Sequence, residues 1–324
     1  MKTNEFHVEH KGQQIAVFRN DLVEPIVTQD AKTDHRPFLH PIMAPDGIGE
    51  LTEYSPGHHP HQTGLYWGFT RVNGSAIGPD IIKKWFYKPD KPADIQKQLG
   101  RDFFHHPGTD YWQRVSADVL EAAGPEVSWQ TVYNMLAADG NTIIVETQTW
   151  SMRDRDNGQK SILDLEWKAE AKTDTAIGEF PYGGMFLRMP FRRENGGRAL
   201  NSEGQANQDA EGQRARWVAV EMPIPGRSEI PEPLCSIAIM DHPSNPDHPT
   251  PWRVDGQFGI GPSRGILSTW KIANGAPAVF RHRILVACGA LDRAGIEQEW
   301  KKFKNSEESL QPPVSGRSIP AGGR

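Results

Sequence analysis

Histidines gather in one short segment of this chain, and their spacing suits acid/base chemistry or metal binding. Four of the twelve histidines in the 324-residue sequence lie between residues 36 and 74, and the segment is centred on His58, His59, Pro60 and His61. If the segment is a strand, His59 and His61 point to the same face, because residues two apart do so. Two imidazoles on one face can share a metal ion or divide donor and acceptor roles around a substrate. The alternative is a surface turn whose rings bond to the backbone.

A second polar cluster follows the apolar run CSIAIM, which has the pattern of a strand. Asp241 and His242 should therefore emerge at a strand end, where a rigid scaffold presents reacting groups. Pairing of Asp241 with His242 would fix the tautomer of the imidazole, and Asn245 and Arg253 follow as candidates for substrate binding. The competing interpretation is a proline-rich connector with a capping aspartate.

Isolated charged and aromatic residues add candidates for substrate binding. Arg188 is the single charge in the apolar run GGMFLRMPF, so it is either half of a structural ion pair or an anchor for a polar ligand. Trp67 suits stacking on a sugar face and suits a buried core equally well. His105 and His106 end a long irregular segment, where they either reach over a cleft or remain solvated loop side chains.

The elements that must position these residues are mostly strands. Glycine and proline are frequent, at 31 and 26 residues, which favours short strands and turns over a helical bundle. Period-two alternation is strong in VSWQTVYNM and SILDLEWKAEAK, as in antiparallel sheets buried on one face. Helical spacing appears over residues 292–304. We therefore expect an all-β fold, a large antiparallel β-sandwich with one C-terminal helix.

The domain organisation follows from the same patterns. One β-sandwich domain is expected over residues 1–304, followed by a flexible tail at 305–324. The alternating segments on either side of Lys11-Gly12 predict an N-terminal hairpin. Residues 76–108 predict a long excursion with a single short helix, and the polar, glycine-rich residues 193–214 predict a flexible loop.

Charge and hydropathy argue against several classes of partner. The net charge is −5 and the basic residues are scattered, so nucleic acid is not an expected partner. The N-terminus is polar and no apolar run is long enough to cross a bilayer, which predicts a cytoplasmic protein without membrane contact. Cys235 and Cys288 lie in apolar runs and are predicted to be buried free thiols. The sequence gives no indication of oligomeric state.

Several long motifs resemble a known family. The order RPF-x-HP-x-x-AP, TE, HPH-x-x-GL-x-x-GF-x-x-VNG, RARW and DHP-x-NP-x-HPT-x-W spans nearly the whole chain. It resembles the bacterial PmoA-related family of unknown function, whose members are often labelled "methane oxygenase PmoA". The resemblance implies a role in sugar metabolism and a fold similar to the large mutarotase-like β-sandwiches of carbohydrate enzymes.

The resemblance also implies which residues form a site. In the early motifs they are Arg36, Glu53, His59, His61 and Asn73, and in the late motif they are Asp241, His242 and Asn245. Many relatives read HPHHRGL where this chain reads HPHQTGL, so Gln62 and Thr63 replace a histidine and an arginine. If that histidine is a metal ligand in relatives, the present site is weaker for metal.

Three functions are consistent with these residues. The first is a lyase, hydrolase or epimerase acting on a sugar or keto-sugar, with His59, His61 and His242 as acid/base groups, Asp241 orienting His242, and Arg36 or Arg188 polarising a carbonyl. The second is a carbohydrate-binding protein without turnover. The third is a metal-dependent oxygenase or hydrolase that uses His59, His61 and His242. The sequence requires no cofactor, and a divalent metal remains an alternative. In all three, residues 36–74 and 241–253 should meet in one cleft.

Overall fold

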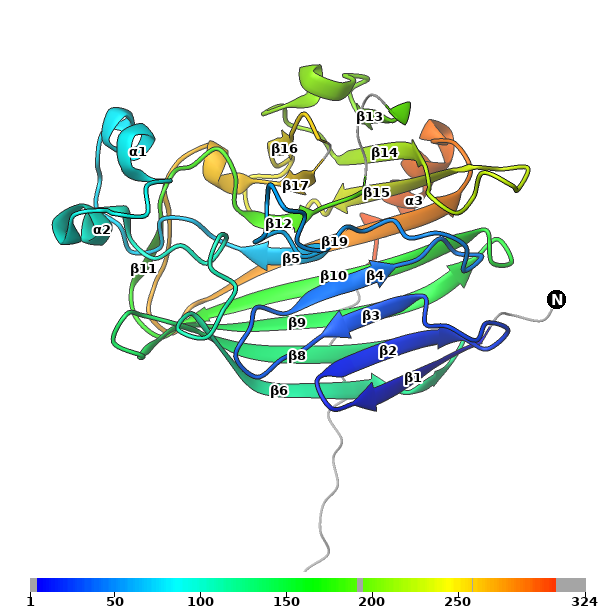
Figure 1. The fold of residues 1–324 in the computed structure, drawn as a ribbon, viewed down its shortest axis with the longest axis horizontal. Helices are drawn as coiled ribbons and strands as arrows, with labels where there is room; N and C mark the ends of the chain where they lie inside the picture. The colour runs from blue at the N-terminus through cyan, green and yellow to red at the C-terminus, as the bar shows by residue number, and fades with distance from the viewer. Residues whose placement is uncertain (1–4, 191–194, 258, 307–324) are drawn as a thin grey trace, which may run out of the picture.

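The chain folds into two large antiparallel sheets that pack face to face, which confirms the expected all-β architecture (Figure 1). This computed structural model describes residues 5–190, 195–257 and 259–306. The first sheet has nine strands in the order β16 (Trp252–Val254), β17 (Ile260–Pro262), β12 (Gly184–Leu187), β5 (Leu65–Gly68), β4 (Phe38–Ile42), β3 (Val27–Asp30), β2 (Gln14–Arg19), β1 (Phe6–Lys11) and β7 (Ala123–Gly124).

The second sheet contains the longest strands. Its eight strands have the order β13 (Arg198–Asn201), β14 (Trp217–Pro223), β15 (Leu234–Asp241), β19 (Pro277–Cys288), β10 (Lys160–Ala171), β9 (Thr142–Arg155), β8 (Glu126–Leu136) and β6 (Trp112–Glu121). A separate pair is formed by β11 (Thr175–Ile177) and β18 (Trp270–Ile272).

Alternating side chains explain how the long strands build the core. In β8, Val127, Trp129, Tyr133 and Met135 are buried, as their period-two spacing predicts. The sequence pattern predicted burial of one face only, but on the acidic face of β10 Asp164 and Glu166 are also buried. Arginines on neighbouring strands cover them; Arg283 Nε, for example, lies 2.7 Å from Asp164 Oδ1. A layer of ion pairs therefore coats this face of the sheet.

Helices lie at the margins of the sandwich. The helix expected over residues 292–304 is confirmed as α3 (Arg293–Phe303), whose first turn is capped by the side chain of Asp292. The excursion at 76–108 contains two short helices, α1 (Pro79–Trp85) and α2 (Ala93–Leu99), where one was expected. Figure 1 shows both at one end of the molecule. The described residues also include the 3₁₀ turns η2 (Asn207–Ala210) and η3 (Arg264–Ile266).

Other sequence expectations are met in part. The N-terminal hairpin is present as β1 and β2. The predicted flexible loop at 193–214 is wrong for residues 198–201, which form β13 because the edge of β14 offers them hydrogen-bond partners.

Both cysteines are free, with Cys235 buried and Cys288 partly exposed. Most of the predicted tail, residues 307–324, lies outside the described residues. Within the described chain, the helices are too short or too polar to span a membrane.

Candidate functional site

The histidine-rich segment forms one wall of a cavity of about 410 Å³. Its other walls come from parts of the chain that are distant in sequence: the excursion at 76–108, the segment leading into β12, and the end of β16. The lining residues are His58, His59, His61, Gln62, Tyr87, Phe104, His105, Tyr182, Phe186, Arg253 and Asp255.

The His59-Pro60-His61 segment is a turn, which was the stated alternative to a strand. The backbone N–H of Gln62 donates to the carbonyl oxygen of His59 over 3.0 Å, which closes the turn. Proline suits a turn as well as an extended strand, so the motif alone does not distinguish them. The rings of His59 and His61 nevertheless lie near each other, with 5.8 Å between their centroids.

Arg36 lies beneath the cavity and holds two of its walls together. Its side chain is fully buried. The guanidinium donates to the carbonyl oxygens of His61 and Phe104, each over 2.6 Å, and its carbon lies 3.6 Å from the centre of the Tyr66 ring. Arg36 is not a lining residue, so its place is that of a positioning residue and differs from the predicted contact with substrate.

Arg188 forms the structural ion pair that was one of its two predicted roles. Its buried guanidinium donates from Nε to Glu53 over 2.8 Å, and from Nη2 to His58 over 3.0 Å and to Gln257 over 3.1 Å. Its Nη1 atom is buried without a hydrogen-bond partner. Arg188 and Glu53 therefore support the loop that carries His58, behind the lining side chains.

Two of the lining imidazoles are held in their neutral form. Burial, helped by the nearby His105 and the cationic Arg36, lowers the pKa of His61 to about 3. Burial and the nearby Arg188 also lower the pKa of His59. At neutral pH both rings are uncharged, so each can accept one hydrogen bond and donate one.

A series of hydrogen bonds leads from the partly buried carboxylate of Asp102 into the cavity. Asp102 Oδ2 accepts from His105 Nδ1 over 2.9 Å, His105 Nε2 lies 3.2 Å from the hydroxyl of Tyr182, and that hydroxyl contacts the hydroxyl of Tyr87. Burial acts to raise the pKa of Asp102, but the hydrogen bonds from His105 outweigh it and the pKa lies below its usual value. Asp102 is therefore ionised at neutral pH.

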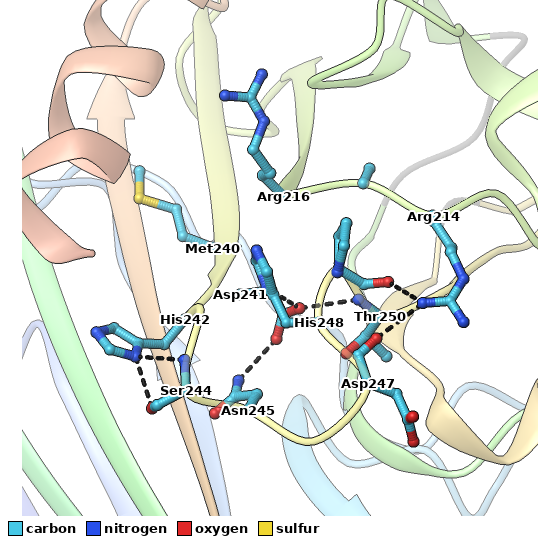
Figure 2. Close-up of polar contacts among 12 residues, drawn as sticks. Arg214, Arg216, Met240, Asp241, His242, Ser244, Asn245, Asp247, His248 and Thr250 are labelled. Atoms are coloured by element: carbon cyan, nitrogen blue, oxygen red, sulfur yellow. Dashed lines mark hydrogen bonds and ion pairs between the residues drawn. The ribbon is translucent and has the colours of Figure 1, made fainter.

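The late motif forms a network of hydrogen bonds around Asp241 (Figure 2). Asp241 is fully buried at the end of β15, and its carboxylate accepts from His248 Nδ1 (2.8 Å), the Thr250 backbone N–H (2.9 Å) and Asn245 Nδ2 (2.7 Å). The expected pairing of Asp241 with His242 is wrong, because adjacent residues of a strand project to opposite faces. His242 instead packs on Phe303 of α3, with 4.9 Å between ring centroids.

The predicted common cleft is only partly realised. Arg253 lines the cavity with His61, whereas Asp241, His242 and Asn245 are not among its lining residues. Asn245 accepts the backbone N–H of Arg281 over 2.7 Å and donates to the carbonyl oxygen of the same residue over 2.8 Å, which joins the late motif to β19. The side chain of Arg253 is held separately, by an ion pair with Glu211.

The two remaining predicted binding residues lie elsewhere. Trp67 is buried and stacks on Trp167 of the other sheet, with 4.4 Å between ring centroids, so it belongs to the core. The Asn73 side chain accepts the backbone N–H of Ala176 over 2.9 Å and lines a different cavity. Neither contacts the cavity that holds the histidines.

Sequence reasoning missed several groups of the site. Tyr87 and Tyr182 line the cavity, and Asp102 lies behind His105. One signal was present: Asp102 precedes His105 by three residues, a spacing that allows a local carboxylate–imidazole bond. His105 lines the cavity, which is one of its two predicted positions, and His106 stacks on Tyr111.

The residues predicted for a metal site are not brought together. His59 and His61 line the cavity, but His242 is not among its lining residues. Across residues 5–190, 195–257 and 259–306, no three His, Cys, Asp or Glu side chains are arranged to hold a metal ion.

Comparison with known proteins places the chain in a family. No curated protein matches the sequence. Among solved structures, an α-galactosidase from Lactobacillus brevis is 9% identical with a TM-score of 0.38, over 90% of this chain and 41% of that one. The chain therefore spans less than half the length of that enzyme. A galactose mutarotase-like protein from Lactobacillus casei is 7% identical with a TM-score of 0.34, over 87% of this chain and 99% of that one. Residues 5–301 match the family of unknown function DUF6807, and the chain belongs to that family.

Proposed function

We propose that this protein is an enzyme that performs acid/base chemistry on a sugar or keto-sugar derivative. The observation that carries the proposal is the composition of the cavity wall, where His59, His61 and His105 stand beside Phe104 and Tyr182. Aromatic rings offer apolar faces to the C–H groups of a sugar. Neutral imidazoles match its hydroxyl groups, because each ring both accepts and donates a hydrogen bond.

The reaction type follows from the groups available. A carbonyl next to a C–H bond acidifies that bond, so a proton acceptor and a cation near the carbonyl oxygen are sufficient to start the reaction. Arg253 is the cationic side chain in the wall, held by an ion pair with Glu211. Loss of a substituent β to the carbonyl then gives a lyase, and addition of water to the resulting double bond gives net hydrolysis. Return of the proton to the other face gives an epimerase.

The proposal is tested by incubating the purified protein with a panel of glycosides and their 3-keto derivatives, followed by mass spectrometry. We expect turnover of a keto-sugar, and we expect His61→Ala to lower kcat/KM by about 10- to 100-fold, the equivalent of one or two substrate hydrogen bonds. His10→Ala is the matched control, since His10 is exposed on β1, far along the sheet from β12.

Two results would contradict enzymatic function. Binding of sugars without any chemical change, in the wild type and in His61→Ala, would indicate a carbohydrate-binding protein. If no glycoside or keto-glycoside binds and none reacts, sugars are not the ligand class.

A further inference from the structure

We propose that Tyr182 takes the proton from the substrate and passes its own proton to His105, whose charge Asp102 then balances. This inference rests on the proposed function and names the residues of the same cavity that transfer the proton. It is carried by consecutive hydrogen bonds: Asp102 Oδ2 to His105 Nδ1 at 2.9 Å, and His105 Nε2 to the Tyr182 hydroxyl at 3.2 Å. Tyr182 and His105 both line the cavity.

Asp102, at the inner end of these hydrogen bonds, determines which group donates at each step. Asp102 Oδ1 also accepts the backbone N–H groups of Phe104 (3.1 Å) and His105 (3.0 Å), so the carboxylate is fixed in place. An ionised carboxylate only accepts hydrogen bonds, hence the proton of neutral His105 is on Nδ1 and its Nε2 carries a lone pair. The Tyr182 hydroxyl must then donate to Nε2. The oxygen of Tyr182 is left to accept, so Tyr87 must be the donor in the contact between the two hydroxyls.

His61 is the obvious competitor, and its surroundings are less suitable. The rings of His61 and His105 lie 4.5 Å apart between centroids, so protonation of one opposes protonation of the other. Asp102 stabilises the imidazolium of His105. For His61, burial, His105 and Arg36 all lower the pKa, to about 3. The proton should therefore reside on His105.

The step is balanced without any redox partner. The C–H bond next to the carbonyl breaks, its electron pair forms the enolate, and the negative charge develops on the carbonyl oxygen. The released proton binds the oxygen of Tyr182 while the hydroxyl proton of Tyr182 moves to His105 Nε2. Burial raises the pKa of Tyr182, so both transfers must occur together and no free phenolate accumulates. Elimination breaks the C–O bond, and the proton returns along the same path to the departing oxygen.

Kinetics with the keto-sugar substrate test this assignment. Tyr182→Phe should lower kcat by about 100- to 10,000-fold with little change in KM, the usual range for a lost general acid/base. Asp102→Asn should also lower kcat, since the charge that develops on His105 loses its balancing carboxylate. Tyr54→Phe, at an exposed tyrosine outside the cavity, is the matched control.

A ligand-free measurement keeps the inference independent of the substrate. The His105 Nδ1 proton should give a far-downfield ¹H NMR signal that disappears in Asp102→Asn and persists in Tyr182→Phe. Near-normal kcat in Tyr182→Phe, with loss of turnover in His61→Ala, would overturn the inference and leave the proposed function intact. If no sugar is turned over, the proposed function fails, and absence of the Asp102-dependent signal would overturn the inference separately.

Discussion

Arg36 holds the backbone of His61 and not its imidazole: Nη2 donates to the carbonyl oxygen of His61 over 2.6 Å. The same guanidinium donates to the carbonyl oxygen of Phe104, next to His105. One buried cation therefore fixes the distance between two histidine-bearing walls that are separated in sequence. Positively charged arginine is costly to bury, and burial lowers its pKa to about 10, so its hydrogen bonds must compensate.

Replacement of Arg36 should reveal this positioning role. Arg36→Met leaves several buried carbonyl oxygens without donors, and we expect the free energy of unfolding to fall by about 3 kcal/mol or more. Urea denaturation measures the change. Arg155→Met, at an exposed arginine, is the control and should stay within about 0.5 kcal/mol of the wild type. Equal stability of both variants would contradict the role assigned to Arg36.

Trp67 should behave as a core residue and not as a sugar platform. Trp67→Ala removes a ring that stacks on Trp167 between the sheets, and the expected loss is about 3 to 5 kcal/mol in unfolding free energy. Trp67→Phe keeps most of the packing, so sugar affinity measured by calorimetry should remain within a few-fold of wild type. A large loss of affinity in the folded Trp67→Phe protein would show that the indole contacts the ligand.

Acid should destabilise the protein through His282. Burial lowers the pKa of this histidine from 6.5 to about 4 in the folded protein, although Asp241 lies nearby. The unfolded chain takes up the proton first as the pH falls, so stability is present above pH 6.5 and is lost between pH 6.5 and 4. The full loss is about 3 kcal/mol.

Urea denaturation at a series of pH values measures the effect of His282. In His282→Gln the fall in stability between pH 6.5 and 4 should be smaller by about that same 3 kcal/mol. Parallel stability curves for the two proteins would rule out His282 as the source.

Chelation should leave the reaction unaffected. His59 and His61 share the cavity without His242, so the third ligand proposed for a metal is not beside them. We expect turnover of the keto-sugar to be unchanged after dialysis against EDTA. The measurement is made on protein purified without a histidine tag, together with elemental analysis. Stoichiometric zinc, copper, iron or manganese, with activity that returns only on its addition, would contradict the acid/base mechanism.

The sequence predicted those features that depend on local patterns. Alternation in Glu126–Leu136 and Lys160–Ala171 identified long antiparallel strands, and the crowding of His58, His59 and His61 identified one wall of the cavity. Such patterns follow from period-two geometry and composition, which need no knowledge of distant contacts.

The partners across the cavity could not be predicted in this way. Tyr182 reaches His105 only because the segment before β12 lies against the excursion at 76–108, a contact between distant parts of the chain. The pairing of Asp241 was mistaken for another reason. Its neighbour His242 projects to the opposite face, while a chain reversal returns His248 to the carboxylate.

The order of strands beside the cavity also bears on when the site can form. β5 has β12 as its neighbour, and β12 is followed by β17, although long stretches of chain separate these three strands in sequence. Such non-local pairings form slowly, because loop closure costs entropy before the contacts repay it. The strands β1 to β4, in contrast, pair with close neighbours in sequence. During synthesis the N-terminal meander can assemble early, whereas the cavity must wait until Arg253 has left the ribosome.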